Sequence, residues 1–385
     1  MEQRDRRLTP LGALSGAAAA ATAPVPDTAG FLAVEDLTVE YAGTEVVHGI
    51  SFGVRTGERL CLLGPSGCGK TTTLQVIAGF LSPAGGRVSI VGQEMTGISP
   101  EHRNIGIVFQ NYALFPHLSV YENIAFGLRM RKVAERAIKE RVGSVLQLVR
   151  LPNVASKRPN QLSGGEQQRI AFARAVVIKP RLLLLDEPFS NLDARLRHEL
   201  RAETLELLQQ LNISTILVTH DQEEAMYIAD RIAVMRSGHI EQIGTGPEIY
   251  HRPVSLFVAR FVGESNVLDG HVRQVAGVSV VVDVPCIGVL VGTSLARLLP
   301  DEPVKVLIRP ESLRVAASST ASAVNRWTAR LERVLPLGAR TEVHARVQEH
   351  RLVAWQLAGK WQGGGPDSTV ELEVDQSDTL VFPAN

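Results

Sequence analysis

The chain has 385 residues and a mass of 41.7 kDa, which exceeds one ordinary core and suits one large domain with one smaller domain. The 40 basic residues balance 40 acidic ones, so no net charge attracts nucleic acid or anionic lipid, and a polyanion-binding protein is disfavoured. Three scattered cysteines, Cys61, Cys68 and Cys286, favour a reducing compartment over a disulfide framework or a structural zinc site.

Residues 1–30 combine a basic cluster (Arg4, Arg6 and Arg7) with an alanine-rich stretch. This arrangement superficially resembles a signal peptide, but Ala17–Ala21 is only weakly apolar. We expect a disordered extension, or a start codon assigned too early, rather than an export signal.

Residues 31–262 alternate short apolar strands with helix-like segments, which predicts an α/β domain with a largely parallel sheet. Each strand candidate is followed at once by a polar or glycine-rich turn, and ligands bind at such carboxyl ends in open α/β sheets. The candidates are Arg59–Leu63, Ile105–Phe109, Leu182–Asp186 and Thr215–Thr219.

Residues 111–165 change to a helical pattern. Tyr121–Arg131 and Glu135–Arg150 carry Ala, Leu, Arg and Lys at helical spacing, which predicts a helical subdomain inserted into the α/β domain.

Residues 263–385 change again, to short β-like runs separated by Gly, Pro, Ser and Asp, which predicts a small all-β barrel domain. The runs are Val278–Val284, Val304–Ile308, Glu342–Val347 and Val370–Val374. Asp283 and Pro285 interrupt the most apolar stretch, so it does not reach the roughly 20 residues of a membrane-spanning helix, and the chain is not expected to be a channel.

A phosphate-binding loop is predicted directly after the first strand candidate. The segment fits the pattern G-x-x-x-x-G-K-[ST], between a strand and a helix-like run. Its glycines let backbone amides approach phosphate oxygens, while Lys70 reaches the β- and γ-phosphates and the Thr71 hydroxyl ligates Mg²⁺. Alkylation of Cys68 is expected to block nucleotide binding. The loop is Gly64, Pro65, Ser66, Gly67, Cys68, Gly69, Lys70 and Thr71.

Two adjacent carboxylates follow the apolar strand Leu182–Leu185. Asp186 is placed to hold Mg²⁺, usually through water. Glu187 reaches further toward the γ-phosphate, where it can orient and deprotonate the attacking water. A GTPase, a kinase or a helicase motor would carry the same pair of motifs.

The segment Leu162–Arg169 (LSGGEQQR) resembles the signature sequence of ABC ATPases and stands shortly before the acidic strand, as in that family. Ser163, Gly164 and Gly165 precede an apparent helix, so their hydroxyl and amides offer a second anion site. In the family this site completes the nucleotide pocket of the opposite subunit. The resemblance therefore implies a head-to-tail homodimer, or pairing with a related ATPase subunit.

The resemblance extends over about 230 residues in the family's order and implies further roles. Tyr41 stacks on adenine, and Thr72 joins the nucleotide-binding set. Gln110 senses Mg²⁺ and the water, His220 contacts the γ-phosphate, and Asp193 couples the two sites.

The resemblance also implies a transport role. In importers of this family, the region corresponding to Asn111–Asn123 receives a short helix of an integral-membrane permease; the alternative is that Tyr112 and Phe115 simply pack the insert. Residues 263–385 resemble the small oligonucleotide/oligosaccharide-fold-like (TOBE) domain of such importers. The resemblance is carried by short matching motifs at Phe261–Asn266 and Ile308–Glu311. We favour dimer stabilisation or regulation for this domain.

The leading hypothesis is therefore an ATP-hydrolysing importer subunit, peripheral on the cytoplasmic face of the inner membrane. It would be linked indirectly to an extracytoplasmic solute-binding protein, and no nucleic acid is expected as a partner. An exporter subunit and a soluble ABC ATPase of DNA repair or translation are the alternatives. The residue sequences of Glu122–Arg129 and Thr219–Ala225 are most similar to those of polyamine (spermidine/putrescine) importers. Ferric-iron, sugar, sulfate and phosphonate systems share much of it.

Overall fold

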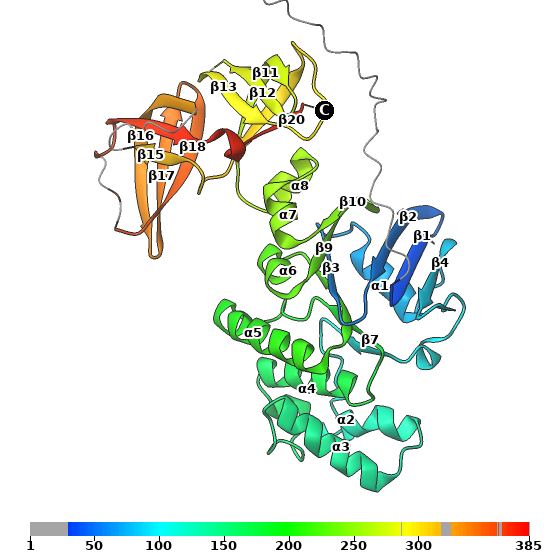
Figure 1. Cartoon of the computed structure of the whole chain (residues 1–385). Helices are drawn as coiled ribbons and strands as arrows, with labels where there is room; N and C mark the ends of the chain where they lie inside the picture. Colours follow the sequence, from blue (N-terminus) through cyan, green and yellow to red (C-terminus); the bar gives the residue numbers. More distant parts are fainter. Residues whose placement is uncertain (1–29, 286, 317–324, 360, 362–363, 385) are drawn as a thin grey trace, which may run out of the picture.

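The computed structural model describes residues 30–285, 287–316, 325–359, 361 and 364–384. The extension expected over residues 1–30 lies outside them except for Gly30, and so does Cys286. Figure 1 shows an α/β part, coloured blue to green, joined through α7 (Gly246–His251) and α8 (Leu256–Phe261) to an all-β part, coloured yellow to red.

The central sheet has six strands in the order β10-β9-β3-β8-β7-β6. Five strands run parallel, and only β10 pairs in the antiparallel sense, with β9. The expected α/β class with a largely parallel sheet is confirmed. The strands are β3 (Arg59–Leu63), β6 (Ile105–Val108), β7 (Leu182–Asp186), β8 (Ser214–Thr219), β9 (Arg231–Arg236) and β10 (His239–Gly244).

A second, antiparallel sheet of four strands in the order β2-β1-β4-β5 was not anticipated from the sequence. Its strands come mostly from the segments on either side of β3 and α1, and short bulges interrupt their pairing. They are β1 (Leu32–Tyr41), β2 (Thr44–Val54), β4 (Gly85–Ile90) and β5 (Gln93–Glu94).

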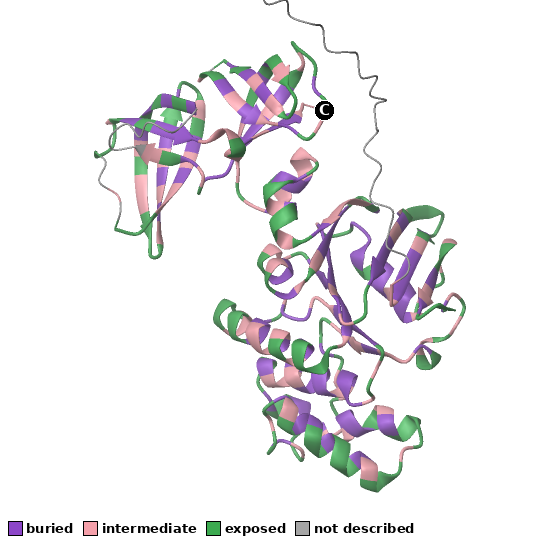
Figure 2. Ribbon diagram, in the orientation of Figure 1, coloured by how far each residue is buried: buried purple, intermediate pink, exposed green. Residues whose placement is uncertain are grey.

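The inner strands of the central sheet are buried, and Figure 2 colours them mostly purple, whereas edge strand β10 is mostly half-buried. Along β7, Leu182 and Leu184 join one apolar cluster with the antiparallel sheet and α1, while Leu183 and Leu185 join the other with the helices. Alternate side chains of a strand point to opposite faces, which explains why β7 is an uninterrupted leucine run.

Helices α2 and α3 lie where the helical spacing predicted them, with ends shifted by one or two residues. α2 and α3 form the insert and pack on α4, which begins at the predicted signature turn. In the described residues, no helix is long and apolar enough to cross a membrane. The helices are α1 (Lys70–Ala78), α2 (Val120–Met130), α3 (Glu135–Leu148), α4 (Gly164–Val176), α5 (Ala194–Leu211), α6 (Gln222–Ile228) and three 3₁₀ turns, η1 (Pro100–His102), η2 (Pro159–Gln161) and η3 (Gln376–Asp378).

The all-β part contains the expected barrel and also a separate five-stranded sheet. The barrel closes because β20, from the end of the described chain, lies between β13 and β14. One apolar cluster runs through barrel and sheet alike. The barrel strands are β11 (Asn266–Ala276), β12 (Ser279–Val284), β13 (Gly288–Thr293), β14 (Pro303–Ile308) and β20 (Thr379–Pro383), and the sheet strands are β15 (Arg314–Ala316), β16 (Asn325–Leu337), β17 (Arg340–Val347), β18 (His350–Leu357) and β19 (Thr369–Val374).

The expectation of a single small barrel was therefore incomplete. Alternating apolar and polar residues predict that a segment is a strand but do not say which strands pair. Pairing of β16 with both β17 and β19, and of β20 with β14, is decided by contacts between segments distant in the sequence.

At the joint between the two parts, the segments Phe261–Asn266 and Ile308–Glu311 noted above come into contact. Arg309 donates from Nη1 to the carbonyl oxygens of Gly263 (2.8 Å) and Glu264 (3.1 Å), and its guanidinium lies 4.4 Å from the ring centroid of Tyr250. The Tyr250 hydroxyl donates to Glu311. Burial, together with the Glu311 carboxylate, raises the pKa of Tyr250 to about 12. Both segments therefore have a structural role at the joint.

Candidate functional site

The predicted phosphate loop connects β3 to α1 at the carboxyl edge of the central sheet. The first hydrogen bond of the α1 ladder runs from Thr73 N to Gly69 O, so the amides of Lys70, Thr71 and Thr72 precede the helix ladder. The helix start has no side-chain cap. These amides and the positive end of the helix dipole can therefore bind an anion.

The loop leaves no space for larger residues at its first glycine. A Cβ atom at Gly64 would lie 2.4 Å from the Met235 carbonyl oxygen and 2.6 Å from the Cys68 sulfur. Gly69 has a φ of 101°, which strongly favours glycine. The Lys70 ammonium donates to the carbonyl oxygens of Gly64 (2.8 Å) and Pro65 (2.9 Å), so the cation is held inside the turn of the loop.

Cys68 is less accessible than its position in the loop suggested. The residue is 3% exposed, and burial raises the pKa of its thiol despite the neighbouring Lys70. Thiolate is the reactive form, so rapid alkylation is no longer expected.

Tyr41 lies at the end of β1 and is 43% exposed. Its hydroxyl donates to Oε1 of Gln75 on α1 at 3.3 Å, which places the ring beside the helix that begins at the phosphate loop. An exposed aromatic ring at this position can stack on a base.

The two predicted carboxylates lie at the end of β7, with Asp186 beside the phosphate loop. The Thr71 hydroxyl donates to Asp186 Oδ1 at 3.1 Å. Burial and then the Glu187 carboxylate raise the pKa of Asp186, while the Thr71 hydrogen bond and Lys70 oppose the rise. A cation bound at this position would therefore stabilise the ionised carboxylate.

Glu187 lies between two other predicted residues. Gln110 Nε2 donates to Glu187 Oε2 at 3.2 Å, and His220 Nδ1 lies 3.2 Å from Oε1. The three side chains come from the ends of neighbouring strands β6, β7 and β8. Glu187 has a φ of 44°, an unfavourable conformation for this residue, and its amide donates to Val218 O at 2.9 Å. Backbone strain of this kind is typical of functional sites.

Two polar contacts that the sequence reasoning missed hold the segment after β6. Asn191 Nδ2 donates to Gln110 O at 2.8 Å, and Arg174 of α4 donates to the carbonyl oxygens of Tyr112 (2.9 Å) and Ala113 (2.7 Å). An arginine in the otherwise apolar run 170–178 was the available signal for the second contact.

The aromatic residues of the segment after Gln110 differ in their exposure. Tyr112 is 6% exposed and belongs to the core, so for this residue the packing alternative is correct. Phe115 is half-buried, with its ring centroid 4.9 Å from that of Phe126, which is 43% exposed. The apolar surface of this region therefore comes from α2 rather than from Tyr112.

The predicted signature residues lie at the start of α4, and Asp193 caps the start of α5. Ser163 and Glu166 form a reciprocal capping box, in which Oγ of Ser163 accepts from Glu166 N (3.3 Å) and Glu166 accepts from Ser163 N (2.8 Å). A Cβ atom at Gly165 would lie 3.2 Å from side-chain atoms of Leu196 and Leu200 on α5. In the described residues, the contacts of this turn join it to α5 rather than to the phosphate loop.

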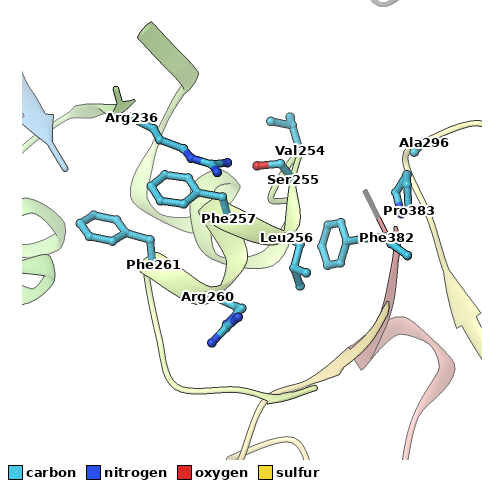
Figure 3. Close-up of a pocket in the computed structure, with 11 residues that line it drawn as sticks. Arg236, Val254, Ser255, Leu256, Phe257, Arg260, Phe261, Ala296, Phe382 and Pro383 are labelled. Carbon is cyan, nitrogen blue, oxygen red and sulfur yellow. The ribbon is translucent and has the colours of Figure 1, made fainter. Parts of the chain in front are cut away.

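The cavity shown in Figure 3 is lined by none of the predicted nucleotide-binding residues. It measures about 680 Å³ between α8 and the barrel. Arg236 stacks on Phe257 in its wall, at 4.7 Å from the ring centroid.

No group of three or more His, Cys, Asp or Glu side chains that could hold a metal is present within the described ranges. Asp186 and Thr71 together offer a carboxylate and a hydroxyl oxygen, which fits a hard cation that takes its other ligands from phosphate and water.

Comparison with known proteins identifies two family models and several relatives. Residues 47–190 match the ABC transporter model, and residues 306–382 match the TOBE domain model. The chain is 46% identical over 293 residues to the spermidine/putrescine import ATP-binding protein PotA of Marinobacter nauticus, covering 74% of this chain and 77% of that protein. It is 49% identical over 280 residues to PotA of Aliivibrio fischeri, covering 72% and 75%.

A solved structure with similar architecture is cbiO1 from Clostridium perfringens, described as part of the ABC transporter complex cbiONQ. The TM-score is 0.53 at 32% sequence identity, covering 57% of this chain and 90% of that one. The similarity to cbiO1 supports the ABC ATPase fold.

Proposed function

Because this chain belongs to the family of ABC transporter ATP-binding proteins, we propose that it powers polyamine import, with spermidine or putrescine as cargo. The chain is an ATPase coupled to transport, as the family implies. The proposed cargo is inferred from the two relatives, which are spermidine/putrescine import ATP-binding proteins.

The catalytic proposal rests on one observation: Glu187 lies 3.2 Å from both Gln110 and His220 at adjacent strand ends. ATP binds with its base on Tyr41 and its phosphates on the loop 64–71 and Thr72, where Lys70 meets the β- and γ-phosphates. Glu187 orients a water and accepts its proton, while Gln110 and His220 hold the Glu187 carboxylate and contact the water and the γ-phosphate.

Mg²⁺ is the proposed companion of ATP. Thr71 and Asp186 would hold it, and Gln110 would contact its ligand shell. The bound ion neutralises charge that develops on the phosphate oxygens. The raised pKa of Asp186, which burial causes, supports a cation at this position beside the Thr71 hydroxyl.

A second chain completes the site in this proposal. Ser163, Gly164, Gly165 and Asp193 would face the nucleotide of a two-fold partner, so that two ATP molecules close a homodimer. Oγ of Ser163 accepts from Glu166 N, and its hydroxyl also interacts with the Glu166 carboxylate, so in this proposal the hydroxyl turns from Glu166 to a phosphate oxygen when the partner's ATP binds. Hydrolysis removes the bridge between the chains and drives the open and closed states.

The domains divide the work as follows. Residues 31–262 form the ATPase domain, with the helical subdomain at about 111–165, and residues 263–385 form the C-terminal domain for dimer stability or regulation. The ATPase docks on integral-membrane permease subunits through the helical subdomain, on the cytoplasmic face of the inner membrane. An extracytoplasmic solute-binding protein delivers the cargo, and no nucleic acid takes part.

Uptake of labelled spermidine and putrescine tests the cargo. A strain without this gene should lose uptake, the natural chain should restore it, and Glu187→Gln should not, although it is made in equal amounts. Unchanged uptake in the deletion strain would reject polyamines and direct the same assay to ferric iron, sugars, sulfate and phosphonates. Restoration by Glu187→Gln would reject the coupling of uptake to hydrolysis at this site.

A further inference from the structure

Arg201 is a buried cation that the catalytic scheme does not use. It lies on α5, two turns after Asp193, and the residue is 5% exposed. A guanidinium withdrawn from water must be paired with carboxylates or it destabilises the fold.

All three carboxylates near Arg201 belong to the start of α6. Arg201 Nη2 lies 2.7 Å from Asp221 and 3.5 Å from Glu224, and Nη1 lies 3.0 Å from Glu223. Arg197, one turn earlier on α5, lies 3.4 Å from the same Asp221. The start of α6 is thus fastened to α5 by charge-assisted hydrogen bonds.

The same carboxylates fix the chain on both sides of His220. Asp221 caps α6 by accepting from Glu224 N at 3.1 Å, and its own amide donates to Thr219 Oγ1 at 3.0 Å. The Thr219 hydroxyl donates to Glu224 at 2.6 Å, and Glu224 is 2% exposed. His220 is thus the residue between two fastened neighbours, with its side chain 55% exposed and reaching Glu187.

We propose that Arg201 is a positioning residue for ATP hydrolysis, which holds His220 in place against Glu187 through Asp221 and Glu224. This inference rests on the role proposed above for His220. It gives α5 a second role besides the proposed role of Asp193 at its start. Through Arg201, the helix also holds His220, which follows strand β8.

The charge balance indicates what the loss of Arg201 would do. Burial raises the pKa of Glu224 and Asp221 raises it further, while the Thr219 hydrogen bond, Arg201 and Arg197 oppose the rise. Without Arg201, Glu224 would have to take up a proton or move toward water. Either change alters its hydrogen bond to Thr219 and so displaces the turn that carries His220.

The test compares Arg201→Met and Arg201→Lys with Arg136→Met, a control on α3 whose side chain is 94% exposed and which has a carboxylate one turn away. Arg201→Met should lower kcat by about 10- to 100-fold with little change in KM for ATP, because the nucleotide-binding residues are untouched. Arg201→Lys should recover part of the loss, and Arg136→Met should behave as the natural chain.

The decisive measurement repeats Arg201→Met in the His220→Ala background, with single-turnover hydrolysis at enzyme excess to follow slow rates. If Arg201 acts through His220, the second substitution should cause little further loss. An equal loss in both backgrounds, or no loss in the natural background, would overturn the inference. Full activity of His220→Ala alone would instead reject the role proposed for His220.

Folding is monitored separately. If Arg201→Met is too unstable to assay, Arg201→Met with Glu224→Gln removes the buried charge as well and should restore stability without restoring kcat. Recovery of kcat together with stability would show that Arg201 is merely structural.

Discussion

The phosphate loop and the signature turn both lead into a helix, but the two helix starts are built differently. α1 begins after Gly69 with no side-chain cap, so its first amides remain available. α4 begins after Ser163 with a capping box that already uses its own side chains. The first start is thus preorganised for phosphate within one chain, while the second is a local structure closed by its own capping box.

The surroundings of the two starts differ in the same way. Asp186, Glu187, Gln110 and His220 gather near the phosphate loop from strands β6 to β8. The signature turn contacts α5 instead. In the function proposed above, catalysis needs both the phosphate loop and the signature turn of a partner chain, and within one chain the two lie apart. Five experiments test the two helix starts and their surroundings, from the largest expected effect to the smallest.

Glu187→Gln should lower ATP hydrolysis by about 10²- to 10⁴-fold, because the amide has the same shape but cannot accept a proton. ATP binding should persist, since the phosphate loop and Tyr41 are unchanged. Phosphate release and binding of a fluorescent ATP analogue measure the two properties. Turnover close to that of the natural chain would remove Glu187 from the proposed role as base.

Gly164→Asp should lower hydrolysis by about 10²-fold or more, because it presents a negative charge to the phosphates of the partner's ATP. The folded chain itself tolerates the change: a Cβ at Gly164 lies 3.5 Å from Leu192, an ordinary contact, and an acid suits a helix start. Gly143→Asp on α3, where the Cβ meets nothing within 4 Å, is the matched control.

Dimers formed from two different variants test the phosphate loop and the signature turn separately. Gly164→Asp and Lys70→Ala should each be inactive alone, but a heterodimer of the two contains one intact site. Co-purified mixtures should therefore regain ATPase activity. If they stay inactive while heterodimers form, the signature turn does not act on the partner's nucleotide.

Glu166→Ala should cost about 0.5–2 kcal/mol of stability, because it removes half of the capping box at α4. The hydrogen bond from Ser163 N lowers the pKa of Glu166 in the folded chain. Its contribution is therefore present above the ordinary glutamate pKa and is lost as the pH falls through the lowered value. Urea unfolding of both chains across this range should show the difference in stability shrinking in acid. A difference independent of pH would contradict the assignment.

Cys68 should react slowly with iodoacetamide in the folded chain, and Cys61 more slowly still. Both thiols are buried, and burial raises the pKa of both. Site-resolved mass spectrometry in native buffer and in urea gives the rates. Labelling of Cys68 at the unfolded rate would show that the phosphate loop opens more readily than its hydrogen bonds indicate.

The sequence by itself determined the fold class, the chemistry of the phosphate loop and the resemblance to ABC ATPases. These features are carried by residues close together in the chain: a glycine-rich turn after a strand, two acids after a leucine run, and LSGGEQQR before a helix. Local backbone geometry and hydrogen bonding limit what such short segments can form, so their composition is informative. The site roles assigned to them stay predictions that the experiments above can test.

Only the tertiary structure decided which distant segments meet. It placed Tyr112 in the core, paired β20 with β14, and brought Arg201 to the start of α6. An arginine on an amphipathic helix has the same local pattern whether it faces water or a buried carboxylate. Burial and pairing depend on contacts between distant segments, which no local pattern encodes.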